Sequence, residues 1–367
     1  MSQPLRDDLE DCLARTQGLW EELRGQRIFI TGATGFFGCW LLETLLWANR
    51  RLQLDARVTI LSRNPGALQN SAPHLAADPA LEVLTGDVRD FRFPAGSFSH
   101  MIHAATESST ELNQKHPTRM FDTIVEGTRR TLDFALASGT RKFLYLSSGA
   151  VYGPQPAEVA NVSEEFTGGP NPLDAASAYA EGKRAAELLC TMISRDAASR
   201  GAASQQTASP ESALEVKIAR CFAFVGPYMK LDAHFAIGNF IRDQMRGGPI
   251  RVAGDGRALR SYMYAGELMV WLWTILFRGQ PLRAYNVGSE QAVSIGELAH
   301  AVSAALAPAV DVEILGTPGS APPHRYVPST ARAQHELGLS CRMPLTDAIR
   351  RTQRWFRESA PALENAQ

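Results

Sequence analysis

Three glycines stand three residues apart in the segment FITGATGFFGCW (29–40). They follow RIFIT (27–31), an apolar run of strand length, and precede GCWLLETLLWANR (38–50), whose apolar residues recur at helical spacing. Glycine permits a tight turn and a close approach of backbone to ligand, and a helix N-terminus offers free N–H groups to phosphates. This order of elements predicts a dinucleotide site. Its candidate contacts are Gly32, Thr34, Gly35, Phe36, Phe37 and Gly38.

Further strand-length apolar runs alternate with helical patterns through the first half of the chain. The runs are RVTILS (57–62), LEVLTGD (81–87), HMIHAA (100–105) and KFLYLSS (142–148), and the longest helical pattern is MFDTIVEGTRRTLDFALAS (120–138). Continuous apolar strands joined by right-handed helical crossovers predict a parallel sheet buried on both faces. We therefore expect an α/β fold: a Rossmann-type, doubly wound parallel sheet with a smaller α/β substrate-binding lobe.

The expected division of the chain follows composition. Beyond about residue 223 the sequence becomes richer in Gly, Pro and Arg, as expected of a ligand-covering lobe. The segment 196–213 is rich in Ala, Ser and Gln and is expected to be a mobile surface loop. The expected parts are an N-terminal helical extension (1–24), a dinucleotide-binding domain (25–222, to which 262–290 returns), and a smaller substrate-binding lobe (223–261 and 291–360).

Composition excludes several classes of protein. The 367 residues are 45% hydrophobic and 20% charged, with a net charge of −1, which gives no reason to expect nucleic acid or a membrane surface as partner. The longest apolar run (268–277) is about half a membrane span, and the acidic start lacks the apolar core of a signal peptide. Five scattered cysteines without CxxC spacing favour a reducing, cytoplasmic location and no metal site.

The second expected strand ends in LSRNP (61–65), where such folds meet the adenosine ribose. An acidic residue there would bind the 2′-hydroxyl of NAD and repel a 2′-phosphate. Here Ser62 and Arg63 offer a hydroxyl and a cation, which favours NADP, although an exposed loop charge is an equal alternative for Arg63. The cofactor is therefore NAD or NADP.

Catalytic chemistry is predicted in SAYAEGKRAAELL (177–189). Tyr179 and Lys183 stand at i and i+4, on one face of a helix. An ammonium near a phenol lowers the phenol's pKa, which gives a general base that takes an alcohol proton as hydride leaves the same carbon. Ser148, at the end of an expected strand, can hydrogen-bond the reacting oxygen, whereas His103 is expected to be a packed strand residue.

Together these motifs resemble the extended short-chain dehydrogenase/reductase family, in its nucleotide-sugar epimerase/dehydratase branch. The resemblance runs from about Arg27 to Arg357. It implies an enzyme with a dinucleotide cofactor and a nucleotide-diphosphate sugar as substrate. The motifs are TGATGFFG (31–38), GDVRD (86–90), HAAT (103–106), SSGAVYG (147–153), YAEGK (179–183), RCFAFVGP (220–227), GDGRALRSYMYAGEL (254–268), YNVGS (285–289) and RYVPSTARAQHELGL (325–339).

The resemblance also implies roles for single residues. Lys183 would hold the nicotinamide ribose as well as act beside Tyr179. Glu107 and Ser108, directly after HAAT, are placed to meet the sugar ring, with a polar loop start as an equal alternative. The remaining roles are Asp87 and Val88 at the adenine, Ala104 and Ala105 along the cofactor channel, and Asn239, Arg260 and Arg325 at the substrate diphosphate.

The reaction type depends on the two residues after Ser148. In 4,6-dehydratases of this branch they are Asp–Glu, and decarboxylases keep the Glu, but this chain has Gly149 and Ala150. Neither moves a proton, so the sequence favours an epimerase that oxidises a sugar carbon, C4, and returns the hydride. Alternatives are an NADPH-dependent 4-ketoreductase, a dehydratase, and a UDP-glucuronate decarboxylase, which YAEGKR and FVGPYM resemble. A non-catalytic dinucleotide-binding protein is disfavoured because the Tyr–Lys pair is present.

Three positions depart from the family pattern: Ala223 and Ile124 each replace an Asn, and Ser261 replaces an Asp. Gly182 is unfavourable inside a helix, which indicates close packing there. Because family members often dimerise through this helix, a homodimer is expected.

Overall fold

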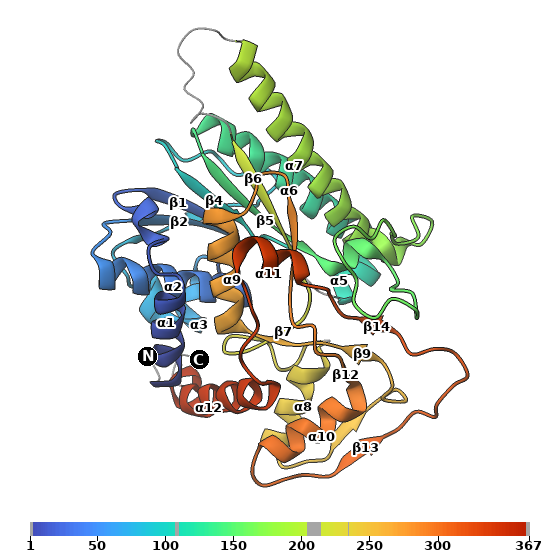
Figure 1. The fold of residues 1–367 in the computed structure, drawn as a ribbon. Coiled ribbons are helices and arrows are strands. Elements are labelled where there is room, and N and C mark those ends of the chain that lie inside the picture. The colour runs from blue at the N-terminus through green and yellow to red at the C-terminus, as the bar shows by residue number, and fades with distance from the viewer. Residues whose placement is uncertain (1–2, 107–109, 204–213, 234, 365–367) are drawn as a thin grey trace.

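The computed structural model describes residues 3–106, 110–203, 214–233 and 235–364. Its centre is a seven-stranded sheet with the order β11-β6-β5-β4-β1-β2-β3, and every neighbouring pair is parallel (Figure 1). The α/β fold with a doubly wound parallel sheet is confirmed. The strands are β1 (Arg27–Thr31), β2 (Arg57–Ser62), β3 (Leu81–Thr85), β4 (His100–His103), β5 (Lys142–Ser148), β6 (Glu215–Cys221) and β11 (Ala284–Val287).

Helices cover both faces of this sheet, and two apolar cores result. Because successive side chains of a strand point to opposite faces, Ile28 and Ile30 of β1 join the core under α1, α2 and α9, whereas Phe29 joins the core under α6 and α7. The helices of the two faces are α1 (Gln3–Arg15), α2 (Phe36–Leu52) and α9 (Ala265–Arg278), against α6 (Pro117–Ala137) and α7 (Ala178–Ala203).

Short elements complete the connections on the large sheet. They are η1 (Trp20–Leu23), α3 (Gly66–Ser71), α4 (Pro73–Ala76), α5 (Thr110–Lys115), η2 (Gly149–Tyr152), η3 (Ala175–Ser177) and α11 (Ala331–Leu337). Strand order reverses between β1 and β4, so the carboxyl ends of these two strands form the crevice where ligands bind in open α/β sheets.

A smaller set of elements lies below the carboxyl ends of the sheet in Figure 1. Its strands form three small sheets, β10-β7, β12-β9-β14 and β13-β8. We propose that these elements are the substrate lobe expected from the sequence. They are β7 (Phe224–Val225), α8 (Ala236–Met245), β8 (Ile250–Val252), β9 (Leu259–Arg260), β10 (Met263–Tyr264), β12 (Val293–Ser294), α10 (Ile295–Ala305), β13 (Val312–Ile314), β14 (Arg325–Tyr326) and α12 (Leu345–Glu364).

Helices α1 and α12, at the two ends of the described chain, pack against each other. Buried Asp8 accepts hydrogen bonds from Tyr264 and Arg351, and Leu5 and Leu9 are 1% exposed in the main core. The strand β11, near residue 285, pairs with β6 of the large sheet, which supports the proposed return of residues 262–290 to the dinucleotide-binding domain.

One expectation is corrected. Residues 196–203, expected in a mobile loop, instead continue α7 to Ala203, because Ala and Arg are strong helix formers. Residues 204–213 lie outside the described chain. Within the described ranges, no helix combines the length and apolar character required to cross a bilayer.

Candidate active site

Each glycine of the turn after β1 has its own steric reason. Gly32 has φ of 71°, and a Cβ there would stand 2.5 Å from the carbonyl oxygen of Ala104, which follows β4. A Cβ on Gly38 would stand 2.3 Å from Cα of Ala33. Gly35 is exposed at the N-terminus of α2, and its Cβ would meet only the Gly32 oxygen, at 3.5 Å. Gly32 and Gly38 thus pack against the protein backbone, whereas Gly35 faces solvent at the N-terminus of α2. This arrangement fits a phosphate group bound at the helix N-terminus.

The loop after β4 is fixed to the end of β1. The amide of Ala105 donates to Oγ1 of Thr31 (3.1 Å), and Nδ1 of His103 lies 2.7 Å from the same oxygen. His103 is 1% exposed, and burial lowers its pKa to about 3. It is therefore a neutral, packed strand residue. Phe37 packs edge-on against Phe224, so the glycine turn also contacts the smaller lobe.

At the carboxyl ends of β2 and β3, a carboxylate lies between two cations. The guanidinium of Arg89 bonds both oxygens of Asp87 (2.9 and 3.2 Å), and together with the charge of Arg63 it lowers the pKa of Asp87. Ser62 is buried and bonds Asn64 in a local turn. The sequence did not single out Arg89. Val88 is buried, and a Cβ on Gly127 of α6 would stand 2.7 Å from its side chain.

Lys183 lies at the carboxyl end of β5, and its amine makes two hydrogen bonds within the chain. Its Nζ donates to the carbonyl oxygen of Leu146 (2.7 Å) and to Oγ1 of Thr106 (3.0 Å), and it lies 6.0 Å from the ring centre of Tyr179. Lys183 is 3% exposed, and this burial lowers its pKa to about 8. A buried amine at the carboxyl end of β5 suits a ribose hydroxyl as well as a phenol.

The expected fall in the pKa of Tyr179 is wrong for this structure. Burial raises the pKa of Tyr179, and contact with Ser148 opposes only part of that rise. The ammonium of Lys183 points instead to Leu146 and Thr106. The start of α7 is held by Asn113, which the sequence did not single out and whose Oδ1 accepts the Tyr179 amide proton at 3.0 Å.

The position after Ser148 is closed by two aromatic rings. A Cβ on Gly149 would stand 2.7 Å from the ring of Phe222 and 2.8 Å from the hydroxyl of Tyr326. That hydroxyl lies 3.5 Å from Oγ of Ser148. With Gly149 followed by Ala150, no carboxylate stands at either place. Tyr326 is 178 residues beyond Ser148, and the sequence did not indicate it.

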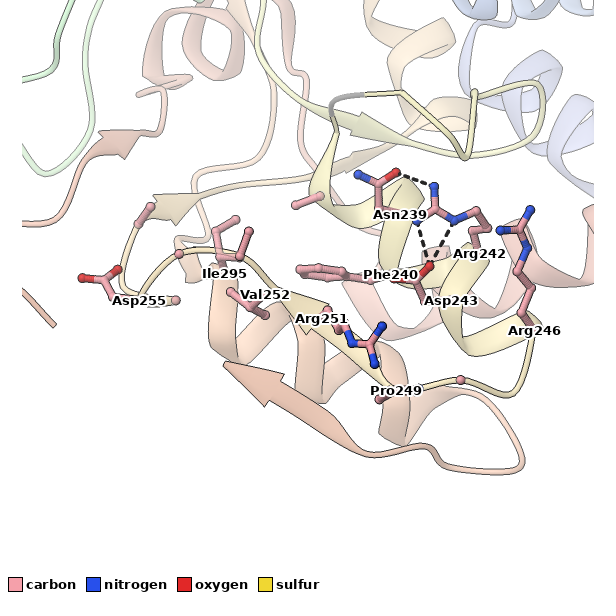
Figure 2. Close-up of a pocket in the computed structure, with 16 residues that line it drawn as sticks. Asn239, Phe240, Arg242, Asp243, Arg246, Pro249, Arg251, Val252, Asp255 and Ile295 are labelled. Atoms are coloured by element: carbon pink, nitrogen blue, oxygen red, sulfur yellow. Dashed lines mark hydrogen bonds and ion pairs between the residues drawn. The ribbon is translucent and has the colours of Figure 1, made fainter. Parts of the chain in front are cut away.

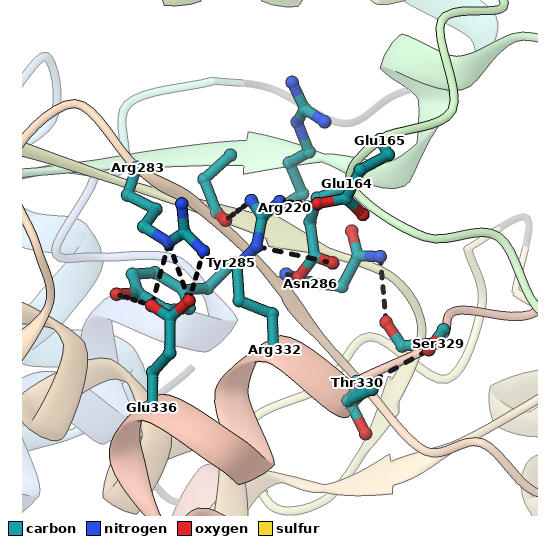
Figure 3. Close-up of polar contacts among 12 residues, drawn as sticks. Glu164, Glu165, Arg220, Arg283, Tyr285, Asn286, Ser329, Thr330, Arg332 and Glu336 are labelled. Carbon is teal, nitrogen blue, oxygen red and sulfur yellow. Dashed lines mark hydrogen bonds and ion pairs between the residues drawn. The ribbon is translucent and has the colours of Figure 1, made fainter.

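Behind the catalytic helix, a polar network ties α7 to three strands. Glu187, one turn after Lys183, accepts from Ser147 (2.5 Å) and from two nitrogens of Arg220 (3.0 and 2.7 Å). Arg220 also donates to the hydroxyl of Tyr152 (2.9 Å), which donates to Oδ1 of Asn286 (2.7 Å). Asn286 extends the network by donating to the carbonyl of Ser329, a contact that Figure 3 shows. The network fixes the orientation of α7 against the carboxyl end of β5.

A cavity of about 660 Å³ lies in the smaller lobe, between α8, β8 and residues 253–258. Figure 2 shows Asn239 at its edge, where its Oδ1 accepts from Arg242 (3.1 Å), which also pairs with Asp243. Arg246 and Arg251 add further cations to the lining. Neither Ser148 nor the Tyr–Lys pair lines this cavity.

Two expected diphosphate ligands lie beyond this cavity. Arg260, on β9, follows the cavity-lining Ala258 by two residues, and β9 pairs with β14, the strand of Tyr326. Arg325 instead donates to the carbonyl of Ala160 (3.0 Å). Because neighbouring strand residues point to opposite faces, the orientation of Tyr326 toward Ser148 turns Arg325 away from it. Glu107 and Ser108 lie outside the described residues.

Of the three departures from the family pattern, Ile124 has a packing explanation. Ile124 of α6 is fully buried, and a Cβ on Gly182 would stand 3.2 Å from it, so the close packing at Gly182 is with α6 of the same chain. Ser261 is also fully buried, and its hydroxyl has no partner among the described residues. The amide of Met263 donates to the carbonyl of Ala223 (3.0 Å), a contact independent of side chain.

Several known proteins resemble this chain in sequence. A sequence model described as the NAD dependent epimerase/dehydratase family matches residues 28–288. UDP-glucuronic acid decarboxylase 1 of Arabidopsis thaliana is 30% identical over 332 residues, covering 90% of this chain and 70% of the relative. UDP-glucuronic acid decarboxylase 1 of Xenopus tropicalis is 26% identical over 342 residues, covering 93% and 75%.

Solved structures share the fold. The dTDP-glucose 4,6-dehydratase of Streptomyces venezuelae, with NAD bound, has a TM-score of 0.73 at 24% identity and covers 93% of this chain and 100% of its own. A UDP-glucuronic acid 4-epimerase of Bacillus cereus, also with NAD, has a TM-score of 0.74 at 18% identity and covers 90% and 99%.

Proposed function

The chain belongs to the NAD dependent epimerase/dehydratase family, and on this premise we propose that it oxidises C4 of a nucleotide-diphosphate sugar acid and then releases CO2. The observation that carries the proposal is the meeting of Ser148, Tyr179 and Lys183 at the carboxyl end of β5. A bound nicotinamide dinucleotide would accept a hydride from C4 and return it later. We propose that the glycine turn, Asp87 and the loop after β4 hold that cofactor.

The protein residues supply the proton chemistry. We propose that Tyr179 takes the proton of the C4 hydroxyl and that Ser148 holds the oxygen as it becomes a carbonyl. Burial raises the pKa of Tyr179, and the positive charge of a bound oxidised nicotinamide would favour the phenolate that this step requires. In a hexuronic acid, the carboxyl group is then β to this carbonyl. Its loss as CO2 sends the electrons of the C5–C6 bond to the C4 oxygen, so decarboxylation requires no base at position 149 or 150. The match to UDP-glucuronic acid decarboxylases over about nine-tenths of the chain supports this reaction.

C4 epimerisation is the second candidate, and the closed position at Gly149 supports it. Positions 149 and 150 supply no acid or base, because Gly149 has no side chain and Ala150 carries only a methyl group. An epimerase requires only that pair and a rotated ketone. The two candidates share the first hydride step and differ in whether the sugar keeps its carboxyl group.

For substrate binding, we propose that the nucleotide occupies the cavity of about 660 Å³ and that its diphosphate runs along β9 to the sugar site. The route is supported by three adjacent contacts. Ala258 lines the cavity and precedes Arg260 of β9 by two residues. Strand β9 pairs with β14, and the hydroxyl of Tyr326 on β14 lies 3.5 Å from Oγ of Ser148. Forked guanidinium groups match phosphate oxygens. Asn239 and Arg260 are the proposed contacts, and Arg325 would have to leave Ala160 to join them.

One experiment tests the proposal. The chain is incubated with UDP-glucuronic acid and NAD⁺ or NADP⁺, and the sugar nucleotides and CO2 are measured. A UDP-pentose with equimolar CO2 supports decarboxylation, and UDP-galacturonic acid supports epimerisation. Tyr179→Phe is the matched control, since it removes one oxygen atom. Absence of any product with a panel that adds UDP-glucose and dTDP-glucose would contradict both candidates.

Cofactor preference is tested separately. Because Arg63 and Arg89 stand near Asp87, we propose that this edge of the sheet contacts the adenosine ribose. Titration calorimetry with NAD⁺ and NADP⁺ decides between them. Arg63→Ala is expected to weaken NADP⁺ selectively if a 2′-phosphate is bound there.

We also propose a homodimer through α6 and α7. Leu188 and Met192 of α7 are 58% and 44% exposed, and Phe121 of α6 is 36% exposed, so these paired helices carry uncovered apolar side chains. Light scattering at micromolar concentration tests this, and Leu188→Glu is expected to give a monomer.

A further inference from the structure

The hydroxyl of Tyr326 reaches the catalytic serine from the smaller lobe. It lies 3.5 Å from Oγ of Ser148, at the outer limit of a hydrogen bond. The two hydroxyl groups are thus adjacent without being tightly paired, and one further oxygen atom can contact both. Tyr179 touches the same Ser148 from α7. Ser148 therefore has a phenol from each lobe beside it.

The backbone around Tyr326 is firmly held. Val327 donates to Oε1 of Gln155 (3.0 Å) and accepts from the amide of Val162 (3.0 Å), and Ser329 donates to the carbonyl of Val162 (2.8 Å). The ring of Tyr326 packs against Phe222 with centres 4.7 Å apart. A hydroxyl held this way requires little rearrangement during the reaction, which is the property that makes a hydrogen-bond donor effective against developing charge.

Its ionisation state suits donation. Burial raises the pKa of Tyr326 well above the usual value for a phenol, and the neighbouring phenol of Tyr179 adds to that rise. The nearby guanidinium of Arg260 opposes it in part. Tyr326 therefore keeps its proton at neutral pH and acts as a donor.

We propose that Tyr326 is a further catalytic residue, whose hydroxyl donates a hydrogen bond to the C4 oxygen of the sugar beside Ser148. This inference rests on the proposed decarboxylation. When the C5–C6 bond breaks, its electron pair forms the C4–C5 double bond, the carbonyl pair moves to the C4 oxygen, and CO2 leaves. Tyr326 stabilises that oxyanion, and a proton from water then restores C5.

The test compares Tyr326→Phe with the parent chain, using UDP-glucuronic acid and the preferred dinucleotide. The variant keeps the ring against Phe222 and removes only the hydroxyl. We expect CO2 release to fall by about 100-fold, the lower end of the range for loss of one oxyanion donor. Absorbance at 340 nm is expected to show the first hydride transfer still occurring, and the Kd for UDP is expected to stay unchanged, because Tyr326 does not line the cavity.

Tyr285→Phe is the matched control, because its hydroxyl bonds Glu336 and the amide of Gln280, away from Ser148. It is expected to leave CO2 release unchanged. Undiminished CO2 release by Tyr326→Phe would overturn the inference while leaving decarboxylation intact. Weakened UDP binding or a lowered melting temperature in parallel with activity would also overturn it, in favour of a structural role. A parent chain that releases no CO2 would overturn the proposed reaction and this inference with it.

Discussion

The catalytic edge at β5 and the small-lobe cavity differ in how much water reaches them. Lys183 is 3% exposed and both of its hydrogen bonds are internal, whereas the side chain of Arg251, in the cavity, is 64% exposed. In a buried, hydrogen-bonded site, a displaced atom leaves a polar group unpaired at a high cost in free energy, because no water replaces the lost contact. In a wet site, charges are screened and exchangeable. The chemistry is thus expected to reside in the rigid half and substrate recognition in the adaptable half.

Tyr179→Phe is the strongest test of whether catalysis and substrate binding reside in separate regions. We expect turnover to fall by about 10³-fold, since loss of a general acid–base group removes about 10²- to 10⁴-fold. The Kd for UDP is expected to stay unchanged, because the tyrosine does not line the cavity. Steady-state kinetics and calorimetry measure the two quantities. Retained turnover would place the chemistry elsewhere.

The dryness of the catalytic edge is expected to appear in the pH dependence of stability. The pKa of Lys183 is about 8 in the folded chain and 10.5 as the reference value. Between these values the unfolded chain binds more protons, so the free energy of unfolding rises with pH through this window. In Lys183→Met this rise is expected to be smaller by up to about 3 kcal/mol. Urea denaturation in the absence of cofactor, at pH 7.5 and at pH 10, measures the change in the free energy of unfolding across most of this pH range.

An exposed lysine provides the control for that experiment. Lys115→Met removes an amine whose side chain is 66% exposed and whose pKa is raised by its bond to Glu111. Any change in the pH dependence of stability is therefore expected to be small and opposite in sign to that of Lys183→Met. An equal change in both lysine variants would mean that burial of the Lys183 amine does not disfavour its charged form.

The glycine turn tests rigidity without touching the chemistry. Gly38→Ala forces a Cβ to 2.3 Å from Cα of Ala33 and is expected to lower stability by about 1–3 kcal/mol. Gly35→Ala is the matched variant, because its Cβ meets only an oxygen at 3.5 Å. It is expected to fold normally but to bind the dinucleotide more weakly. Equal stability of the two variants would show that the turn relaxes.

The smallest effect is expected in the wet half. Arg260→Ala is expected to weaken UDP binding by about tenfold, the range of one charge-assisted hydrogen bond, while kcat changes less. Arg246→Ala, farther along the cavity lining, is the comparison variant. A larger effect on kcat than on binding would mean that Arg260 acts on the sugar instead of the diphosphate.

The sequence predicted local features better than distant contacts. Gly32, Gly35 and Gly38, the strands and the spacing of Tyr179 and Lys183 follow from neighbouring residues, because turns and helices have fixed periods. The sequence did not predict the direction in which Lys183 points.

Two features depended on tertiary structure. Tyr326 reaches Ser148 from 178 residues away. Arg325 was expected at the diphosphate, but strand alternation turns it to Ala160. Neither of these has a spacing that a sequence pattern encodes. The reaction type was also open, and the relatives favour the decarboxylase alternative over the epimerase that Gly149 and Ala150 suggested.

The two rings over Gly149 limit how this enzyme's reaction can change by mutation. A single substitution to Asp, the residue that dehydratases carry there, would collide with both Phe222 and Tyr326. An acid there requires one of the two rings to shift or to be reduced, and loss of the phenol would remove a donor that we assign to the proposed reaction. A change at Tyr326 is therefore expected to pass through a less active enzyme, whereas a smaller residue at Phe222 would make room without removing that donor.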